Sequence, residues 1–511
     1  MRFTPCQAPC VQANIATIGK ANTMKDRIAF DGITFDDVLL VPARSNVTPA
    51  ELDMSTNLTS RIRLNIPLVS SPMDTVTSGA LAIALAQEGG IGVIHRNLSK
   101  DAQAIEVEKV KRSESGIITD PITLPPTEST QTARTVMAEH DVSGVPIVVD
   151  DGKLVGILTR RDMKFLPQET EIDQVMTKTN LVTAPPETSL DEARNILNQH
   201  KVEKLLLVDN DNKLAGLITM RDIDKLEQFP RSCKDSRGRL RVAAAVGVLD
   251  YERVDALIAK DVDVIFIDTS HGHKDIVLET IRQIKSTHDI DVIAGNIATA
   301  QAAEDLISAG ADGLRVGIGP GAICTTRVVT GVGVPQMTAI SQCAHVGDAN
   351  GVPVIADGGI RHSGDITKAI AAGASLVMLG SLFAGLDESP GRLVIHGGRR
   401  FKTYRGMGSM DAMAAGSADR YSQGQTDRNR LVPEGVEGRV PYRGPLGDLV
   451  HQLVGGLRSG MDHCGTENIE QLRKNSSFVR ISPASLTENH PHDIEITHEA
   501  PNYTLSMFQG D

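Results

Sequence analysis

Residues 262–268 read Val-Asp-Val-Ile-Phe-Ile-Asp, a mostly apolar run that ends on a carboxylate. Similar runs, each closed by Asn, Gly or Asp, follow at 292–296, 313–317, 352–357 and 375–380. Stretches of helical composition, such as 300–309 and 364–372, separate these runs. Apolar runs joined by helices predict parallel strands that are buried on both faces of a sheet.

Two architectures bury a parallel sheet in this way, a doubly wound sheet and a closed barrel. None of the runs is followed by the Gly-x-Gly-x-x-Gly pattern of a dinucleotide-binding doubly wound sheet. We therefore expect an α/β protein whose main domain is a (β/α)8 TIM barrel, formed by residues 25–115 and 229–511. Roughly 400 residues are enough for a barrel, which typically needs about 250. Residues 1–24 are predicted to be a disordered N-terminal extension.

The intervening residues, 116–228, contain an internal repeat. Pro-Pro-Thr-Glu-Ser at 125–129 recurs as Pro-Pro-Glu-Thr-Ser at 185–189, and the same offset aligns 153–162 with 213–222. Each copy predicts an amphipathic helix, two strands joined by a hairpin turn, and a helix opened by Thr-x-Arg-Asp. We expect an α+β domain inserted in a βα loop, on the catalytic face of the barrel.

This repeat resembles a tandem pair of CBS motifs, a Bateman module, which implies purine nucleotides as effectors. From the residues alone, Thr159 with Asp162 and Thr219 with Asp222 have two interpretations. They either hold phosphate and ribose at a helix N-terminus or only cap the two helices.

Charge and composition exclude several classes of protein. The net charge is −12 without a long Lys or Arg run, so we expect no nucleic-acid partner. No stretch approaches the ~18–20 apolar residues of a membrane span, and the first two dozen residues lack a secretory signal. Six cysteines scattered over 511 residues fit reduced thiols, which predicts a cytoplasmic protein.

The most specific segment is Arg-Val-Gly-Ile-Gly-Pro-Gly-Ala-Ile-Cys-Thr-Thr-Arg at 315–327. It follows a predicted barrel strand, and barrel chemistry takes place beyond the carboxyl ends of the strands. Its glycines leave backbone groups free to face an ion, and Cys324 lies beside hydroxyls and a positive charge. Such a setting favours a reactive thiol. Cys233, Cys343 and Cys464 lack it and are interpreted as structural.

Two later strands end in glycine-rich turns, Asp-Gly-Gly-Ile at 357–360 and Leu-Gly-Ser-Leu at 379–382. Barrel enzymes often bind phosphate at this place with backbone amides and a short helix. Asp357 is suited to accept hydrogen bonds from ribose hydroxyls. The residues about 409–440 are polar and rich in glycine, which predicts a mobile flap.

These motifs resemble the inosine-5′-monophosphate (IMP) dehydrogenase family in its bacterial form, from about Phe35 to Tyr503 and with the CBS insertion. Further motifs of the family are Val-Thr-Gly-Val-Gly-Val-Pro-Gln at 329–336, Tyr-Arg-Gly-Met-Gly-Ser at 404–409, Asp-Arg-Tyr at 419–421 and Pro-Glu-Gly-Val-Glu-Gly at 433–438. The resemblance implies that Cys324 attacks carbon 2 of the hypoxanthine ring while a hydride passes to NAD+. Water then hydrolyses the thioimidate to xanthosine monophosphate.

The resemblance also implies roles for individual residues. The catalytic residues would be Cys324, Thr326, Arg420 and Tyr421. The substrate would contact Ala322, Asp357, Gly358, Gly359, Gly380, Ser381, Tyr404, Arg405, Gly406, Met407, Gly408 and Glu434. NAD+ would contact Asp268, Thr269, Ser270, Asn296, Gly317, Ile318 and Gly319. A K+ ion would bind Gly319, Gly321 and Cys324, with Glu488, Asn489 and His490 from a neighbouring subunit.

The shared ion site implies a homotetramer and leaves an octamer open. Arg420 would activate water, although a guanidinium with a reference pKa above about 12 is an unusual base. The flap must therefore either perturb this arginine or relay the proton.

Two positions depart from the family pattern. Ala322 replaces a usual serine, which removes one hydroxyl contact to phosphate, and Ser71-Pro72 replaces a small Ala pair. Two other functions stay open: guanosine-5′-monophosphate (GMP) reductase, which lacks the Arg-Tyr pair, and a catalytically silent nucleotide sensor. The intact Cys324, Thr326 and Arg420 favour the dehydrogenase.

Overall fold

The computed structural model describes Met24, Ile118 and residues 27–48, 51–113, 121–140, 142–166, 169–424 and 426–503. The predicted N-terminal extension, 1–24, lies outside the described residues except for Met24.

Eight parallel strands form the central sheet, in the order β4-β16-β15-β14-β13-β12-β11-β5. Their bounds are β4 Leu68–Ser70, β5 Val93–Ile94, β11 Ala243–Val246, β12 Val264–Asp268, β13 Asp291–Ile297, β14 Gly313–Val316, β15 Val354–Asp357 and β16 Leu376–Leu379. The sheet closes beside β5, where Ser70 N donates to Ile91 O over 3.1 Å and Ile91 N to Leu68 O over 3.2 Å. The predicted (β/α)8 barrel is confirmed, and the doubly wound alternative is excluded.

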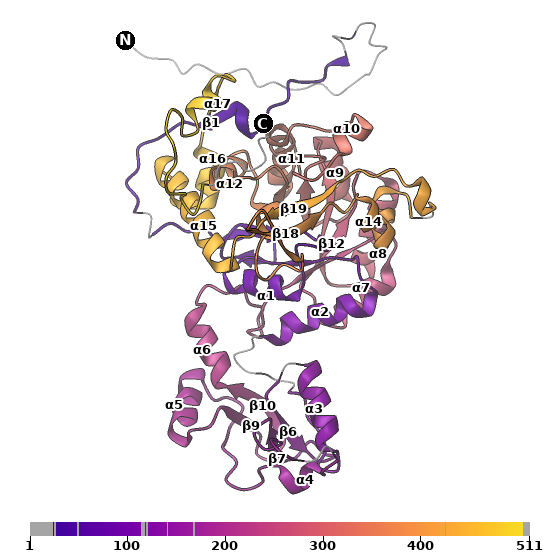
Figure 1. Ribbon diagram of the computed structural model, residues 1–511, viewed down its shortest axis with the longest axis vertical. Helices are drawn as coiled ribbons and strands as arrows, with labels where there is room; N and C mark the ends of the chain where they lie inside the picture. The colour runs from indigo at the N-terminus through magenta and orange to yellow at the C-terminus, as the bar shows by residue number, and fades with distance from the viewer. Residues whose placement is uncertain are drawn as a thin grey trace.

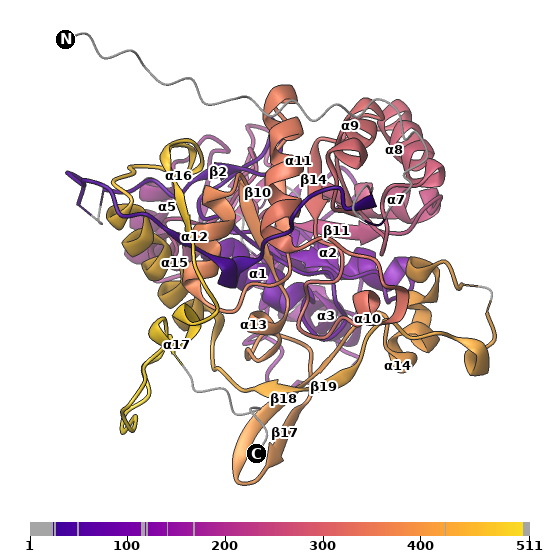
Figure 2. The same cartoon turned by 90° about the horizontal axis from the view of Figure 1, so that it is seen from above.

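Helices surround this barrel (Figure 2). The helices that alternate with the strands are α1 Gly79–Gln87, α2 Lys100–Ser113, α7 Tyr251–Ile258, α8 Asp275–Thr287, α9 Ala300–Ser308, α11 Gln336–Asn350, α12 Ser363–Ala371 and α15 Leu446–His463. All residues of β11 and β12 are buried, because Ala, Val, Ile and Phe fill both faces of these strands. Among the described residues, we find no helix with the length and apolar character needed to cross a membrane.

Further elements elaborate the barrel. They are η2 Phe35–Asp37, β1 Val38–Leu40, β2 Thr56–Asn57, β3 Arg63–Leu64, α10 Thr326–Thr330, α13 Ser381–Ala384, β17 Leu393–His396, β18 Arg399–Arg405, α14 Met410–Ala412, η3 Met413–Ser417, η4 Ala418–Tyr421, η5 Arg428–Arg430, β19 Glu437–Pro441, α16 Ile469–Asn475, β20 Phe478–Arg480 and α17 Ser485–Glu488. Strands β17, β18 and β19 form an antiparallel sheet of their own. Its hairpin projects from one side of the barrel (Figure 2).

The inserted lobe leaves the barrel after α2 and returns at β11. Because α2 packs on α1 and α7, it completes a β/α unit before the insertion begins. The insertion therefore occupies an αβ connection, at the amino ends of the strands, and our expectation of a βα loop on the catalytic face is wrong. The lobe lies beyond α1 and α2 (Figure 1). Helix α2 was not recognised from the sequence because polar Gln103 and Lys111 belong to its buried face.

The lobe contains two similar halves. Its elements are α3 Thr130–Glu139, β6 Gly144–Val148, β7 Leu154–Thr159, α4 Ile172–Val175, β8 Thr183–Ala184, α5 Leu190–His200, β9 Lys204–Val208, β10 Leu214–Thr219 and α6 Met220–Gln228. Ser129 and Ser189, from the repeated motifs, cap α3 and α5 with their side chains. Lys153 and Lys213, which are equivalent in the two copies, form an antiparallel bridge between the halves.

The prediction of a helix after Thr159, in the first copy of the repeat, is wrong. After Thr159 the chain forms a turn, because Asp162 Oδ2 accepts hydrogen bonds from Thr159 N over 2.8 Å and from Thr159 Oγ1 over 2.7 Å. In the second copy, α6 begins directly after Thr219 as expected. The side chain of Asp222 lies outside the described residues.

Candidate active site

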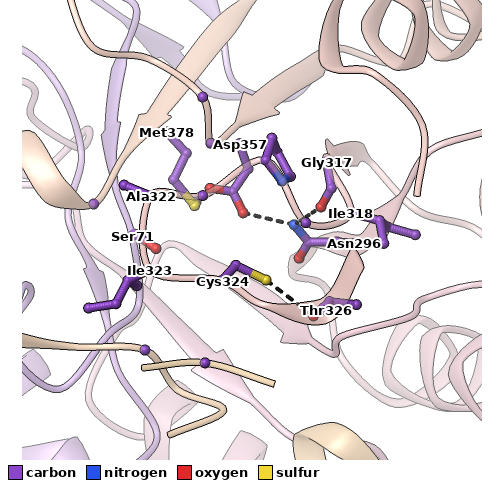
Figure 3. Close-up of a pocket in the computed structure, with 18 of the residues that line it drawn as sticks. Ser71, Asn296, Gly317, Ile318, Ala322, Ile323, Cys324, Thr326, Asp357 and Met378 are labelled. Atoms are coloured by element: carbon purple, nitrogen blue, oxygen red, sulfur yellow. Dashed lines mark hydrogen bonds between the residues drawn. The ribbon is translucent and has the colours of Figure 1, made fainter. Parts of the chain in front are cut away.

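A cavity opens at the carboxyl ends of the barrel strands. Its volume is about 340 Å³, within the range of roughly 300–1,000 Å³ that small-molecule sites occupy. The loop after β14 brings Cys324 and Thr326 to this cavity, and Asn296 and Asp357 lie across from them (Figure 3). The predicted site residues that line the cavity are Asp268, Ser270, Asn296, Gly317, Ile318, Gly319, Gly321, Ala322, Cys324, Thr326, Asp357, Gly358, Gly359, Gly380, Ser381, Tyr404, Gly406, Met407, Gly408, Arg420, Tyr421 and Glu434.

The thiol begins a short chain of polar groups. Cys324 Sγ donates to Thr326 Oγ1 over 3.1 Å, and Thr326 Oγ1 donates to Glu434 Oε2 over 2.8 Å. The backbone supports this arrangement, since Thr325 N donates to Glu434 O over 3.0 Å. A thiol, a hydroxyl and a carboxylate in sequence give a thiol proton a path to an acceptor.

Asp357 is oriented by two neighbours before any ligand binds. Asn296 Nδ2 donates to Asp357 Oδ2 and to Gly317 O, both over 2.8 Å (Figure 3). Arg315 Nε donates to the same carboxylate oxygen of Asp357 over 2.9 Å. The carboxylate is thereby held at the end of β15, between the cysteine loop and the glycine turn at 357–360.

Three arginines surround the buried carboxylate of Asp268. Arg315 Nη1 and Arg420 Nε donate to it over 2.6 and 2.9 Å, and Arg96 Nε lies 3.8 Å from its Oδ2. Burial alone would raise the pKa of Asp268, but the three guanidinium groups outweigh burial and lower the pKa to about 2. Asp268 is therefore ionised at neutral pH.

The segment predicted to be a flap, 409–440, contributes Arg420, Tyr421 and Glu434 to the lining of the cavity. Arg420 Nη1 donates to Tyr421 Oη over 2.8 Å, and Ser270 N donates to Arg420 O over 3.1 Å. Burial would lower the pKa of Arg420, but the carboxylate of Asp268 outweighs burial and raises it. Arg420 is therefore a cation in this arrangement, which favours proton relay over direct base action. Flap residues also contact Asp268 and Ser270, two of the residues predicted to bind NAD+.

Five predicted site residues do not line the cavity. Thr269 is buried behind it and donates from Oγ1 to Gly295 O over 2.7 Å. Arg405 faces away and donates from Nη2 to Asp74 Oδ2 over 2.6 Å. Glu488, Asn489 and His490, at and after α17, are exposed on the same chain.

Several lining residues were not predicted as site residues. Met73, Arg315 and Met378 line the cavity, and so do Asp36 and Arg361, which form an ion pair at its edge. Arg315 carried a usable signal, because it interrupts an otherwise apolar strand whose residues are all buried. A buried arginine requires a buried anionic partner, which predicts carboxylates nearby.

The other described cysteines differ from Cys324, which is partly exposed. Burial raises the pKa of the Cys233 and Cys343 thiols to about 12, so both stay protonated and inert. Cys464 is also buried, and burial raises its pKa. These environments agree with the structural interpretation of the three residues.

The fold and the cavity together define a (β/α)8-barrel enzyme whose site is centred on a cysteine. A family model described as the IMP dehydrogenase / GMP reductase domain matches residues 32–492. The chain belongs to this family.

Individual relatives and structures refine the comparison. The chain is 59% identical to the inosine-5′-monophosphate dehydrogenase of Rhodopirellula baltica over 497 residues, 96% of this chain and 92% of that protein. It is 55% identical to the enzyme of the same name from Bacillus subtilis over 488 residues, 94% of this chain and 100% of that protein. A crystal structure of a GMP reductase variant from Trypanosoma brucei, in complex with GMP, is 40% identical with a TM-score of 0.84, and the match covers 93% of this chain and 100% of that one.

Proposed function

We propose that the protein oxidises IMP to xanthosine-5′-monophosphate with NAD+, the committed step of guanine nucleotide synthesis. The observation that carries the proposal is the chain from Cys324 through Thr326 to Glu434 inside the cavity. The names of relatives at 55–59% identity support the same reaction.

The reaction divides into two steps around Cys324. In the first step, the thiol loses its proton through Thr326 towards Glu434, and Sγ forms a bond to carbon 2 of the base. NAD+ supplies the oxidising power by accepting the hydride that leaves carbon 2. In the second step, water adds to the thioimidate at carbon 2, the bond to Sγ breaks, and the thiol and the product are released.

The remaining lining residues suit a nucleotide monophosphate. Asp357, held by Asn296 and Arg315, is placed to accept hydrogen bonds from ribose hydroxyls. The turn at 357–360 and the short helix α13, which Ser381 begins, suit a phosphate. Ala322 offers only backbone contact there, so we expect a modest loss of phosphate affinity.

The flap separates the two steps. Asp268 and Ser270 suit the dinucleotide, yet Arg420 contacts both in the closed state. NADH must therefore leave before the flap closes. This order keeps water out during hydride transfer and admits one water for hydrolysis afterwards. The proton that Glu434 took from the thiol passes to solvent once NADH has left. Arg420, as a cation beside Tyr421, then orients the water. Thr326 with Glu434 takes a proton from this water and returns it to Sγ as the bond to carbon 2 breaks.

We also propose that a K+ ion binds the cysteine loop. The ligands would be carbonyl oxygens of Gly319, Gly321 and Cys324, which are donors that K+ prefers. Gly319 has φ +78°, a left-handed conformation that glycine adopts without strain and that lets the loop turn there. We further propose that residues 488–490 of a neighbouring subunit complete the site in a homotetramer, with an octamer still open.

The inserted lobe is proposed to be a CBS pair that binds purine nucleotides. Its support is the repeat, the bridge between Lys153 and Lys213, and the separate position of the lobe beside the barrel. The free thiols of the four described cysteines support a cytoplasmic location.

Absorbance at 340 nm tests the proposed reaction. Purified protein with IMP, NAD+ and K+ should form NADH, and Cys324→Ala should not. The GMP reductase structures favour a second candidate, so NADPH oxidation with GMP is measured in parallel. Oxidation of NADPH without NADH formation from IMP would establish the reductase. Absence of both reactions would favour the silent sensor. The buried Arg420–Tyr421 pair favours the dehydrogenase.

A further inference from the structure

We propose that Arg96 is a positioning residue that latches the flap closed by its ion pair with Asp419. The inference rests on the proposed function and deepens it. It identifies the contact that sets the equilibrium between the dinucleotide-bound enzyme and the enzyme with the flap closed.

The latch joins the loop after β5 to the flap. Arg96 Nη1 donates to Asp419 Oδ2 over 2.7 Å. The Arg96 side chain is only 9% exposed, whereas that of Asp419 is 45% exposed. Asp419 directly precedes Arg420, and its Oδ1 also accepts from Arg420 N over 2.9 Å. The ion pair therefore holds the residue that carries Arg420 into the cavity.

The barrel prepares the receiving loop independently of the flap. Arg253 of α7 donates from Nη1 to Leu98 O over 3.2 Å and to Gln103 Oε1 over 2.8 Å. Buried Gln103 donates in turn from Nε2 to Ile94 O and Ala245 O. These contacts fix the backbone around Arg96 to the barrel wall, so Arg96 stays beside Asp268 when the flap leaves.

Arg96 has a second anion within reach. Its Nε makes no hydrogen bond to the described residues and lies 3.8 Å from Asp268 Oδ2. When the flap opens, Asp268 loses Arg420 and Arg96 loses Asp419. The two groups left behind have opposite charges and can pair directly. Exchange of partners offsets part of the cost of opening, which keeps the two flap states close in free energy.

The charge-neutral variant Asp419→Asn isolates the latch. It keeps an acceptor for Arg420 N and removes only the charge that faces Arg96. Since a partly exposed ion pair is worth at most about fivefold in an equilibrium, we expect closure to weaken by about two- to fivefold. The steady-state rate, if limited by hydrolysis, follows the fraction of closed enzyme and should fall by part of this factor, while the initial NADH burst is unchanged.

Binding of NADH to the enzyme separates a latch from a structural role. A weaker latch frees Asp268 and Ser270 more often, so the Kd of NADH should fall in Asp419→Asn. The fold decreases in Kd and in the hydrolysis rate should multiply to the weakening of closure, about two- to fivefold. General damage to the fold would instead weaken NADH binding. Lys100→Met is the matched control, because Lys100 pairs with Glu252 near the same loop without contacting the flap.

The double variant Arg96→Met/Asp419→Asn completes the test. If the two residues act as a pair, hydrolysis in the double variant is no slower than in Arg96→Met alone. If Asp419→Asn binds NADH and hydrolyses the intermediate as the wild type does, the latch is overturned. NADH formation from IMP would in that case still support the proposed function. Absence of NADH formation by the wild type would defeat both.

Discussion

Arg420 Nε lies 2.9 Å from Asp268 Oδ2, although the two residues belong to the flap and to the end of a barrel strand. The same carboxylate accepts from Arg315 of the next strand but one over 2.6 Å. Asp268 thus joins the rigid barrel to the movable flap. If Asp268 binds the dinucleotide, as proposed, this one carboxylate would make ligand binding and flap closure exclusive.

The depressed pKa of Asp268 predicts a pH-dependent contribution to stability. A carboxyl with a pKa of about 2 in the folded state and about 3.9 when unfolded contributes about 2–3 kcal/mol above pH 5. The contribution is lost as the pH falls towards 2, and about half remains at pH 3. Urea unfolding of wild type and Asp268→Asn should therefore give a free-energy difference that shrinks between pH 6 and pH 3. A constant difference over that range would contradict the assignment.

Close packing at Gly408 predicts a defect that is larger in hydrolysis than in NADH formation. A Cβ there would lie 2.7 Å from Cζ of Tyr421 and 2.9 Å from its Oη, so Gly408→Ala should keep the flap from closing fully. We expect hydrolysis to slow by at least about tenfold, as for a misplaced catalytic group, and the NADH burst to slow less. Gly438→Ala is the control, because a Cβ there meets nothing within 4 Å. Equal effects of the two variants would refute the packing argument.

The proton path through Thr326 predicts a distinct result for Glu434→Gln. The glutamine still accepts the hydrogen bond from Thr326 but cannot take a proton. We expect the rate of the slowest step to fall by about a hundredfold, the usual contribution of a general base. Rapid-mixing kinetics measure this, with exposed Glu437→Gln as the control. A wild-type rate in Glu434→Gln would exclude the path.

The proposed K+ site shared with a neighbouring subunit predicts complementation between subunits. Activity should fall when K+ is replaced by Li+ and return when K+ is restored. Glu488→Ala and Cys324→Ala should each be inactive alone. Mixed and reassembled, they should recover part of the activity, because some sites then receive an intact Cys324 and an intact Glu488. No recovery from tetramers proven to be mixed would argue against a ligand from the neighbour.

The sequence predicted the barrel and the cysteine loop because their signals are local, whereas most of the other cavity residues were assigned from the family resemblance. Apolar strands and the glycine loop around Cys324 need no knowledge of the tertiary structure. The errors have equally local causes. Arg405 was assigned with its motif, but side chains alternate along β18, so Tyr404 faces the cavity and Arg405 faces Asp74. The predicted position of the insertion was wrong because polar Gln103 and Lys111 lie on the buried face of α2 and obscure its amphipathic pattern.

The latch could not be predicted from the sequence. Arg96 and Asp419 are 323 residues apart, and each occurs in a polar segment without an obvious partner. The pairing of β5 with β11, and of β11 with β12, brings the end of β5 near the end of β12, and the docked flap places Asp419 against Arg96.

The covalent step at Cys324 is the central claim, and Arg420→Ala exposes it most directly. Without the flap arginine, hydrolysis should slow while hydride transfer continues. Mixing with IMP and NAD+ should then give close to one NADH per site, and mass spectrometry of the quenched enzyme should show one nucleotide on the peptide that carries Cys324. NADH formation with no nucleotide on this peptide, or NADH formation by Cys324→Ala, would contradict the account.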